Sequence, residues 1–143
     1  MTLRELARHT KTRTAGRFRW GHWVAVVAYA GLIFYLSAQP QPPEAVETVL
    51  QALGDRVLHA VEYGVLSVLC YRAFGYAAGA WAATRAVTLA IVASIGYGIT
   101  DEIHQAFVPL RDADPADVFM DAIGATVAVL FWSQLVEPVK AED

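Results

Sequence analysis

The sequence predicts an all-α integral membrane protein, a four-helix bundle with its N-terminus in the cytoplasm. Composition is the first reason: of 143 residues, 56% are hydrophobic and 17% are charged, whereas a soluble domain carries about a quarter charged residues. The second reason is a set of four apolar segments, each near the roughly 20 residues that cross a bilayer. The third is the distribution of charge, because six of the eleven basic residues precede the first apolar segment.

The first 19 residues are expected to form a basic cytoplasmic tail, either disordered or folded as a short surface helix. The four-helix domain is expected over residues 20–137, and residues 138–143 form a cytoplasmic C-terminal tail. The first transmembrane helix begins near Trp20 and ends before the proline-rich segment 40–43, because proline lacks an amide hydrogen and clashes with the preceding turn. This run is too long for the apolar region of a signal peptide, which favours a retained anchor.

Three more helices follow, with boundaries set by proline, glycine and charge. A short interfacial helix is expected within the acidic segment 44–54. The transmembrane helices are expected at about residues 55–74, 85–107 and 114–136. Pro115 suits the first turn of the last helix, and Gly124 and Ala128 give that helix a face of small residues for close helix contact. The lone Cys70 lies in an apolar stretch and reads as a small buried hydrophobe.

The orientation follows from the positive residues. With the N-terminus inside, nine of the eleven Lys and Arg residues lie on the cytoplasmic side, and only Arg56 and Arg111 lie outside. The protein is therefore expected in the bacterial cytoplasmic membrane, with the start of helix two, the end of helix three and the start of helix four facing outward.

Those three outward ends carry a constellation of ionisable residues. Helical spacings of three and four place Asp55, His59 and Glu62 on one face of their helix. Asp101, His104 and Gln105 share a side of the next helix, with Glu102 about 100° round from Asp101, and the aspartates of the last helix form one stripe. The sets are Asp55, Arg56, His59 and Glu62; Asp101, Glu102, His104 and Gln105; and Asp114, Asp117 and Asp121, with Arg111 in the loop between the last two helices. Because charges in the membrane are expensive, these groups must face inward, pair, or meet water. Asp121 is the deepest and needs a partner from helix two or three.

The negative charge of this cluster limits the states in which it can exist in a partly dry site. Without Asp114 at the helix end, six carboxylates against two arginines would give a net charge of −4 if all were ionised; the six are Asp55, Glu62, Asp101, Glu102, Asp117 and Asp121. Three solutions exist: shared protons, ionised histidines, or a bound divalent metal. The candidate metal ligands are His59, Glu62, Asp101 and Asp121, a mixed oxygen and imidazole set that suits several ions.

Each residue also has a structural alternative. Asp55, Arg56 and Asp117 suit ordinary helix ends, where the dipole favours anions at the N-terminus. His59 suits a hydrogen-bonded core histidine, although Glu62 one turn later favours a functional role. Ser37 is the one candidate nucleophile near the outer end of the first helix.

Four motifs together resemble the VanZ-like family of bacterial membrane proteins, and the resemblance covers most of the chain from helix one to helix four. They are Leu36-Ser37-x-Gln39-Pro40, Asp55-Arg56-x-x-His59-x-x-Glu62-Tyr63, Asp101-Glu102-x-His104-Gln105-x-Phe107-Val108-Pro109-x-Arg111, and Asp117-x-x-x-Asp121-x-x-Gly124. Two positions depart from the family pattern. Arg56 stands where lysine is expected, and Asp121 stands where asparagine is also common.

The resemblance implies a protein of the cell envelope with a contribution to teicoplanin resistance. Together with the orientation and the polar cluster, this setting predicts action at the outer leaflet on a lipid-linked envelope component or on the target of a glycopeptide drug. In an enzyme, the catalytic residues would be Asp101, Glu102, His59 and His104, and the binding residues would be Arg111, Arg56, Asp55, Glu62, Gln105, Asp117 and Asp121. There are two alternatives. The protein could bind a lipid headgroup or a drug without catalysis, or it could be a structural subunit of a membrane complex. The lipid bilayer is the expected partner, nucleic acid is not, and the oligomeric state stays open.

Overall fold

The computed structural model describes residues 3–41, 43–44, 47–48, 54–111 and 113–136, and of residues 3–18 it describes the backbone alone. Helix accounts for 83% of the structure, and the described residues contain no strand. The helices are α1 (Leu3–Ser37), α3 (Asp55–Ala77), α4 (Ala80–Ala83), α5 (Ala86–Gln105) and α6 (Pro115–Leu135). Four of them contain segments long and apolar enough to cross a membrane, at Arg19–Ser37, Asp55–Ala77, Ala86–Gln105 and Pro115–Leu135. The predicted fold class and number of spans are confirmed.

The helix boundaries follow the local signals in the sequence. Helix α3 starts at Asp55 as predicted, but it continues three residues beyond Phe74. Gly79 then turns the chain with a positive φ of 85°, a conformation that glycine adopts without steric cost. At the start of α6 the Asp114 side chain accepts a hydrogen bond from the Ala116 amide, and Pro115 occupies the first turn.

Two expectations differ from the structure or lie outside it. The first membrane span begins at Arg19, beside the predicted Trp20, but it is not a separate helix, because α1 runs without interruption from Leu3 to Ser37 and includes the basic segment. No proline stands in this stretch to break it. The short helix expected within residues 44–54 falls largely outside the described residues, although Glu44, Glu47 and Thr48 are helical.

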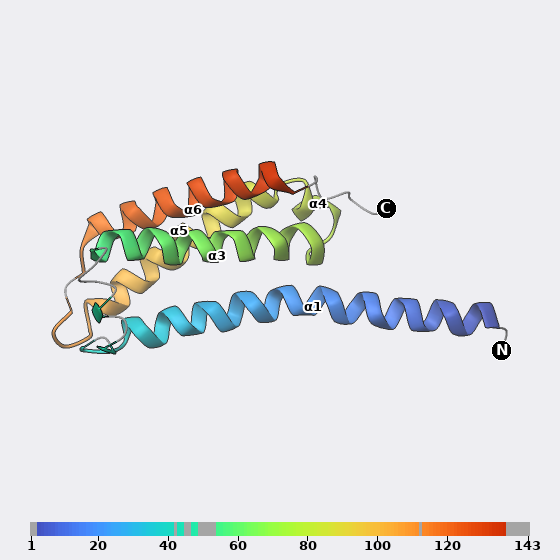
Figure 1. Cartoon of the computed structure of the whole chain (residues 1–143), viewed down its shortest axis with the longest axis horizontal. Helices are drawn as coiled ribbons and strands as arrows, with labels where there is room; N and C mark the ends of the chain where they lie inside the picture. The colour runs from blue at the N-terminus through green and yellow to red at the C-terminus, as the bar shows by residue number, and fades with distance from the viewer. Residues whose placement is uncertain (1–2, 42, 45–46, 49–53, 112, 137–143) are drawn as a thin grey trace.

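Helix α3 is the centre of the bundle, and it packs on α1, α5 and α6 (Figure 1). Helix α1 lies along one side, touches α5 briefly and makes no contact with α6 among the described residues. The closest approach joins α3 and α6, where a Cβ added to Gly124 would overlap the carbonyl of Ala60. A Cβ added to Gly64 would lie 3.2 Å from the Cβ of Ala128. Small residues allow this approach, as predicted for Gly124 and Ala128.

The bundle has a polar end and an apolar half. We call the polar end the region where α1 and α5 finish and where α3 and α6 begin, on the left of Figure 1. The N-terminus of α1 lies at the opposite end. Away from the polar end, the core is largely apolar and contains Leu66, Cys70, Tyr71, Ala86, Ala90 and Val129. Cys70 is buried there, as predicted.

Candidate functional site

The polar end buries an unusual number of polar side chains for a bundle of this size. Those buried there are Ser37, His59, Asp101, Glu102, Gln105, Asp117 and Asp121. They come from all four spanning helices, so the three sets of polar residues found in the sequence do meet at one place. Charged residues are rarely fully buried unless they are paired, and their partners therefore define the site.

A small cavity of about 30 Å³ lies among these side chains. It exceeds the roughly 10–15 Å³ that one water molecule requires. Its polar lining consists of Ser37, Asp55, His59, Glu62, Asp101, Gln105 and Arg111, and its apolar lining includes Ile33, Leu36 and Leu58. Asp55, His59 and Glu62 all face this cavity, which confirms that they share one face of their helix. Glu62 is half-buried.

A chain of hydrogen bonds runs along one wall of the cavity. The Ser37 hydroxyl donates to Asp101 Oδ1 at 2.6 Å, and Gln105 Nε2 donates to Asp101 Oδ2 at 3.1 Å. Arg111 then donates to Gln105 Oε1 at 3.1 Å. A hydroxyl beside a carboxylate that a third group holds in place is the geometry of a nucleophile and its general base. The sequence identified Ser37 as a candidate but offered no sign of its partner 64 positions away.

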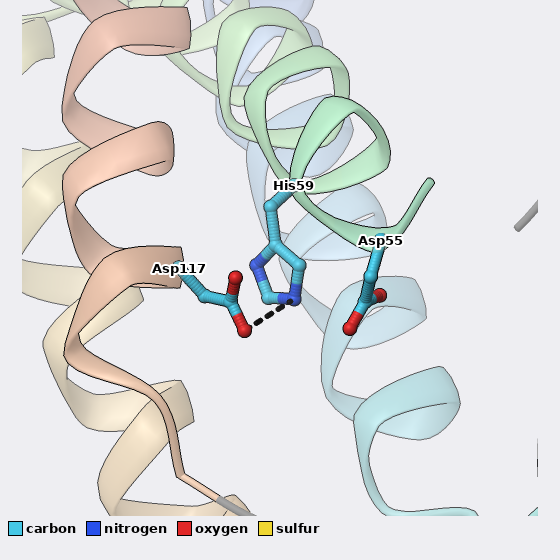
Figure 2. Close-up of side chains that lie close together, drawn as sticks. All are labelled: Asp55, His59 and Asp117. Atoms are coloured by element: carbon cyan, nitrogen blue, oxygen red, sulfur yellow. Dashed lines mark ion pairs between the residues drawn. The ribbon is translucent and has the colours of Figure 1, made fainter. Parts of the chain in front are cut away.

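His59 is the centre of a second group, of which Figure 2 draws Asp55, His59 and Asp117. Its Nδ1 lies 3.1 Å from Asp121 Oδ1, and because a carboxylate only accepts, Nδ1 donates this hydrogen bond. Its Nε2 lies 4.0 Å from Asp117 Oδ2. One ligand atom each from Asp55, His59 and Asp117 lie within 4.8 Å of one another, so these three residues could hold a metal ion. The expectation that Asp121 needs a partner from another helix is confirmed.

Three predicted site residues lie outside this arrangement. Glu102 points to the loop before α6, where its Oε2 accepts a hydrogen bond from the Asp114 amide at 2.9 Å. The ring of His104 stacks on Phe34 of α1, with centroids 4.4 Å apart. Arg56 is exposed and pairs with Asp114 at 3.4 Å. None of the three lines the cavity.

Asp114, which lies outside the spans, marks the aqueous rim of the polar end. The hydrogen bond from the Ala116 amide and the pairing with Arg56 lower the pKa of the Asp114 carboxyl. This side chain is therefore an anionic helix cap in contact with water, in contrast with Asp117 and Asp121 on the same helix, which are buried.

One residue of the site gave no signal in the sequence. Gly98 of α5 faces Asp121, and a Cβ added to it would lie 2.6 Å from Asp121 Oδ2. The absence of a side chain there makes room for the buried carboxylate. Only the position of α5 against α6 reveals this, because Gly98 is one of several glycines in an apolar segment.

Comparison with known proteins fixes the family. The sequence model of the family described as VanZ/LLP1 matches residues 18–136, which is most of the chain. The chain belongs to the VanZ-like family. The matched residues contain all four spans and every residue of the polar end. Neither the search of curated proteins nor the search of solved structures returned a match.

Family membership and the four spans together make this a multi-pass membrane protein in a lipid bilayer. In such a protein, an intramembrane ionisable residue marks a functional site by default. The polar end has the parts for acid–base chemistry: a hydroxyl on a held carboxylate, an imidazole between carboxylates, and an arginine at the cavity wall.

Proposed function

We propose that this VanZ-like protein binds the anionic headgroup of a lipid-linked cell-envelope component at the extracytoplasmic face of the membrane and carries out acid–base chemistry on it. A contribution to teicoplanin resistance is the cellular consequence, since such components include the targets of glycopeptide drugs. The single observation that carries the proposal is the mixed lining of the cavity at the polar end.

That lining suits an amphiphile. Ile33, Leu36 and Leu58 form an apolar part that matches an acyl or polyprenyl chain, and the remaining wall is polar. Ligand sites generally combine an apolar wall with a few placed polar groups. With a volume of about 30 Å³, the cavity accommodates a few atoms of a headgroup, so the rest of the ligand lies in the bilayer.

The side chains divide into two roles. Arg111 carries the cationic group that would hold a phosphate, and Gln105 fixes its position. Asp101 would draw the proton from the Ser37 hydroxyl, or from a water molecule in its place, with His59 as the second acid–base group. Arg56 is paired with Asp114 and has a smaller share in binding.

The test uses the full-length protein in nanodiscs with polyprenyl phosphate and polyprenyl diphosphate as probes. We expect the wild type to bind and convert at least one of them, and Asp101→Asn to lower turnover by about 10²–10⁴-fold, the usual contribution of a general base. Asp114→Asn is the matched control, because it makes the same change at the rim and asparagine still caps the helix. Binding without turnover would favour a non-catalytic binder. If the wild type neither binds nor converts any probe, the proposal fails.

The extracytoplasmic location has its own test. The polar end lies opposite the N-terminus of α1 (Figure 1), and the basic N-terminal segment is expected inside. In a Cys70→Ser background, Ala113→Cys at the polar end should react with a membrane-impermeant maleimide in intact cells. Ala78→Cys, at the opposite end, should react only after lysis. The reverse pattern would place the cavity in the cytoplasm.

Teicoplanin resistance is tested in cells. Expression of the wild type in a susceptible host should raise the inhibitory concentration of teicoplanin, and Asp101→Asn expressed at the same level should not. An equal effect from both proteins would separate resistance from the chemistry of the polar end.

A further inference from the structure

The three ligand atoms in Figure 2 converge on one point from two helices. Asp55 and His59 stand one turn apart on α3, and Asp117 stands in the first turn of α6. Tetrahedral ligation at about 2.0–2.2 Å places ligand atoms about 3.3–3.6 Å apart. The three ligand atoms lie within 4.8 Å of one another, so side-chain rotation would bring them to that geometry.

The second observation is the state of His59. The residue is 5% exposed, and among the described residues its Nε2 has no partner within hydrogen-bond distance, since the Asp117 oxygen is 4.0 Å away. Because Nδ1 contacts Asp121, Nε2 is the ring nitrogen that lies with the carboxylate oxygens of Asp55 and Asp117. A cation placed between this nitrogen and the two carboxylates would be attracted by both negative groups.

Asp121 supplies the hydrogen-bond acceptor that a metal-binding histidine requires for its second ring nitrogen. Histidine ligands almost always donate their second ring N–H to a carboxylate or carbonyl, which fixes the tautomer and the ring orientation. The hydrogen bond from His59 Nδ1 to Asp121 Oδ1 at 3.1 Å is this contact. Gly98 leaves the space that Asp121 needs.

From these observations we propose that Asp55, His59 and Asp117 bind one divalent transition metal ion, Zn²⁺ or Mn²⁺, with Asp121 as the positioning residue for His59. An imidazole with two carboxylates suits these ions, whereas Mg²⁺ prefers an all-oxygen shell with several waters. Asp55 is exposed, so an ion held by these three residues would be accessible from outside the bundle. The ion explains how a site rich in carboxylates accepts an anionic headgroup, and in that respect the inference rests on the proposed function and extends it. With metal bound, His59 is a ligand, and the ion replaces the imidazole as the second acidic group beside Asp101.

The test titrates the full-length protein in detergent, after removal of metal by a chelator, with Zn²⁺, Mn²⁺ or Mg²⁺ alone. We expect one equivalent of Zn²⁺ or Mn²⁺ to bind by calorimetry and elemental analysis, at least about tenfold more tightly than Mg²⁺. Asp55→Asn and Asp117→Asn should each weaken binding at least about tenfold. Asp114→Asn, one turn before Asp117 and outside the ligand set, should stay within about threefold of the wild type.

The role of Asp121 is separated by a pair of variants. Asp121→Ala removes the acceptor behind His59 and should weaken metal binding by about 10–100-fold. Asp121→Asn keeps an acceptor oxygen and should restore binding to within about threefold of the wild type. A loss of folding alone would not give this rescue, and circular dichroism and gel filtration establish that each variant is folded.

Two results would overturn the inference. One is a wild type that binds no metal saturably, which would leave His59 as an imidazolium between Asp117 and Asp121. The other is an Asp55→Asn variant that binds metal as tightly as Asp114→Asn. Asp55 is exposed in the first turn of α3, so its variant decides the matter even if Asp117→Asn does not fold. The metal titration contains no lipid, so its result does not depend on the proposed function. A protein that binds metal but none of the polyprenyl probes would support the metal site and contradict the proposed function.

Discussion

Helices α3, α5 and α6 bury opposite kinds of side chain in their two halves. In the apolar half most buried side chains are apolar, with Ala73, Ala90 and Val129 fully buried. Two serines are buried among them: the Ser67 hydroxyl donates to the Ala125 carbonyl, and the Ser94 hydroxyl has no hydrogen-bond partner among the described residues. At the polar end the same helices bury carboxylates and an imidazole. Tyr63 Oη, Glu102 Oε1 and Asp121 Oδ2 are buried there without a hydrogen-bond partner.

The difference shows which half stabilises the bundle and which half is maintained for another purpose. A buried polar atom without a partner costs about 1–3 kcal/mol. Apolar residues of similar volume often match or improve on a buried ionic group. The polar end therefore lowers the stability that the apolar half provides, a pattern typical of functional sites.

The largest loss of stability is expected at the close contact between α3 and α6. Gly124→Ala places a methyl group on the carbonyl of Ala60 and forces α3 and α6 apart. We expect a loss of about 1–3 kcal/mol in the free energy of unfolding, the usual range for overpacking. The measurement is reversible unfolding in mixed detergent micelles.

The control for this variant is Gly96→Ala on α5. Nothing lies within 4 Å of a Cβ added to Gly96, so alanine there should leave the free energy unchanged or raise it by about 0.5–1 kcal/mol. Equal losses in both variants would mean that the α3–α6 contact is looser than the structure shows.

Two neighbouring tyrosines differ in whether the hydroxyl has a hydrogen-bond partner. The rings of Tyr63 and Tyr97 lie 6.3 Å apart, but only the Tyr97 hydroxyl has a partner, the Ala30 carbonyl at 2.6 Å. Tyr97→Phe should lower the free energy of unfolding by about 1 kcal/mol, and Tyr63→Phe should leave it unchanged or raise it. A loss in Tyr63→Phe equal to that in Tyr97→Phe would reveal a bound water or headgroup on the Tyr63 hydroxyl.

Much of the fold follows from the sequence, because a bilayer imposes the length and apolarity of each span. Pro115 and Asp114 fix the start of α6, and Gly124 and Ala128 identify the face that contacts α3. The start of α1 could not be predicted in this way. Basic residues are good helix formers as well as markers of a cytoplasmic segment, so composition alone does not separate a tail from an extended helix.

The site was predictable as a set of residues but not as a set of pairs. Helical spacing placed Asp55, His59 and Glu62 on one face, and depth required a partner for Asp121. Which acidic group meets His59, and that Ser37 meets Asp101, depends on the rotation and height of α6 and α1 against α3 and α5. Tertiary packing sets those quantities, and no local pattern encodes them.

A smaller effect tests the apolar half. Ser67→Ala removes the hydrogen bond of 2.8 Å to the Ala125 carbonyl between α3 and α6. Interhelical hydrogen bonds in membrane proteins contribute about 0.6 kcal/mol on average, and we expect a loss of that size. Ser133→Ala is the control, because its hydroxyl bonds only within its own helix, to Leu130. A similar loss in both variants would assign the effect to the serine itself and not to the contact between helices.

The smallest effect belongs to Asp114, where the polar end meets water. The Ala116 amide and Arg56 lower the pKa of its carboxyl. As pH falls, this carboxyl therefore takes up a proton in the unfolded chain at a higher pH than it does in the folded protein. Asp114 therefore stabilises the fold above its unfolded pKa of about 3.9, and this contribution disappears as pH falls through the folded pKa. Asp114→Asn caps the helix without titrating. The difference in unfolding midpoint between wild type and variant should be present at neutral pH and vanish in acid, and a difference independent of pH would contradict the assignment. A carboxylate at the rim thus stabilises its helix because water remains available to it, whereas the buried Asp121 on the same helix depends on His59.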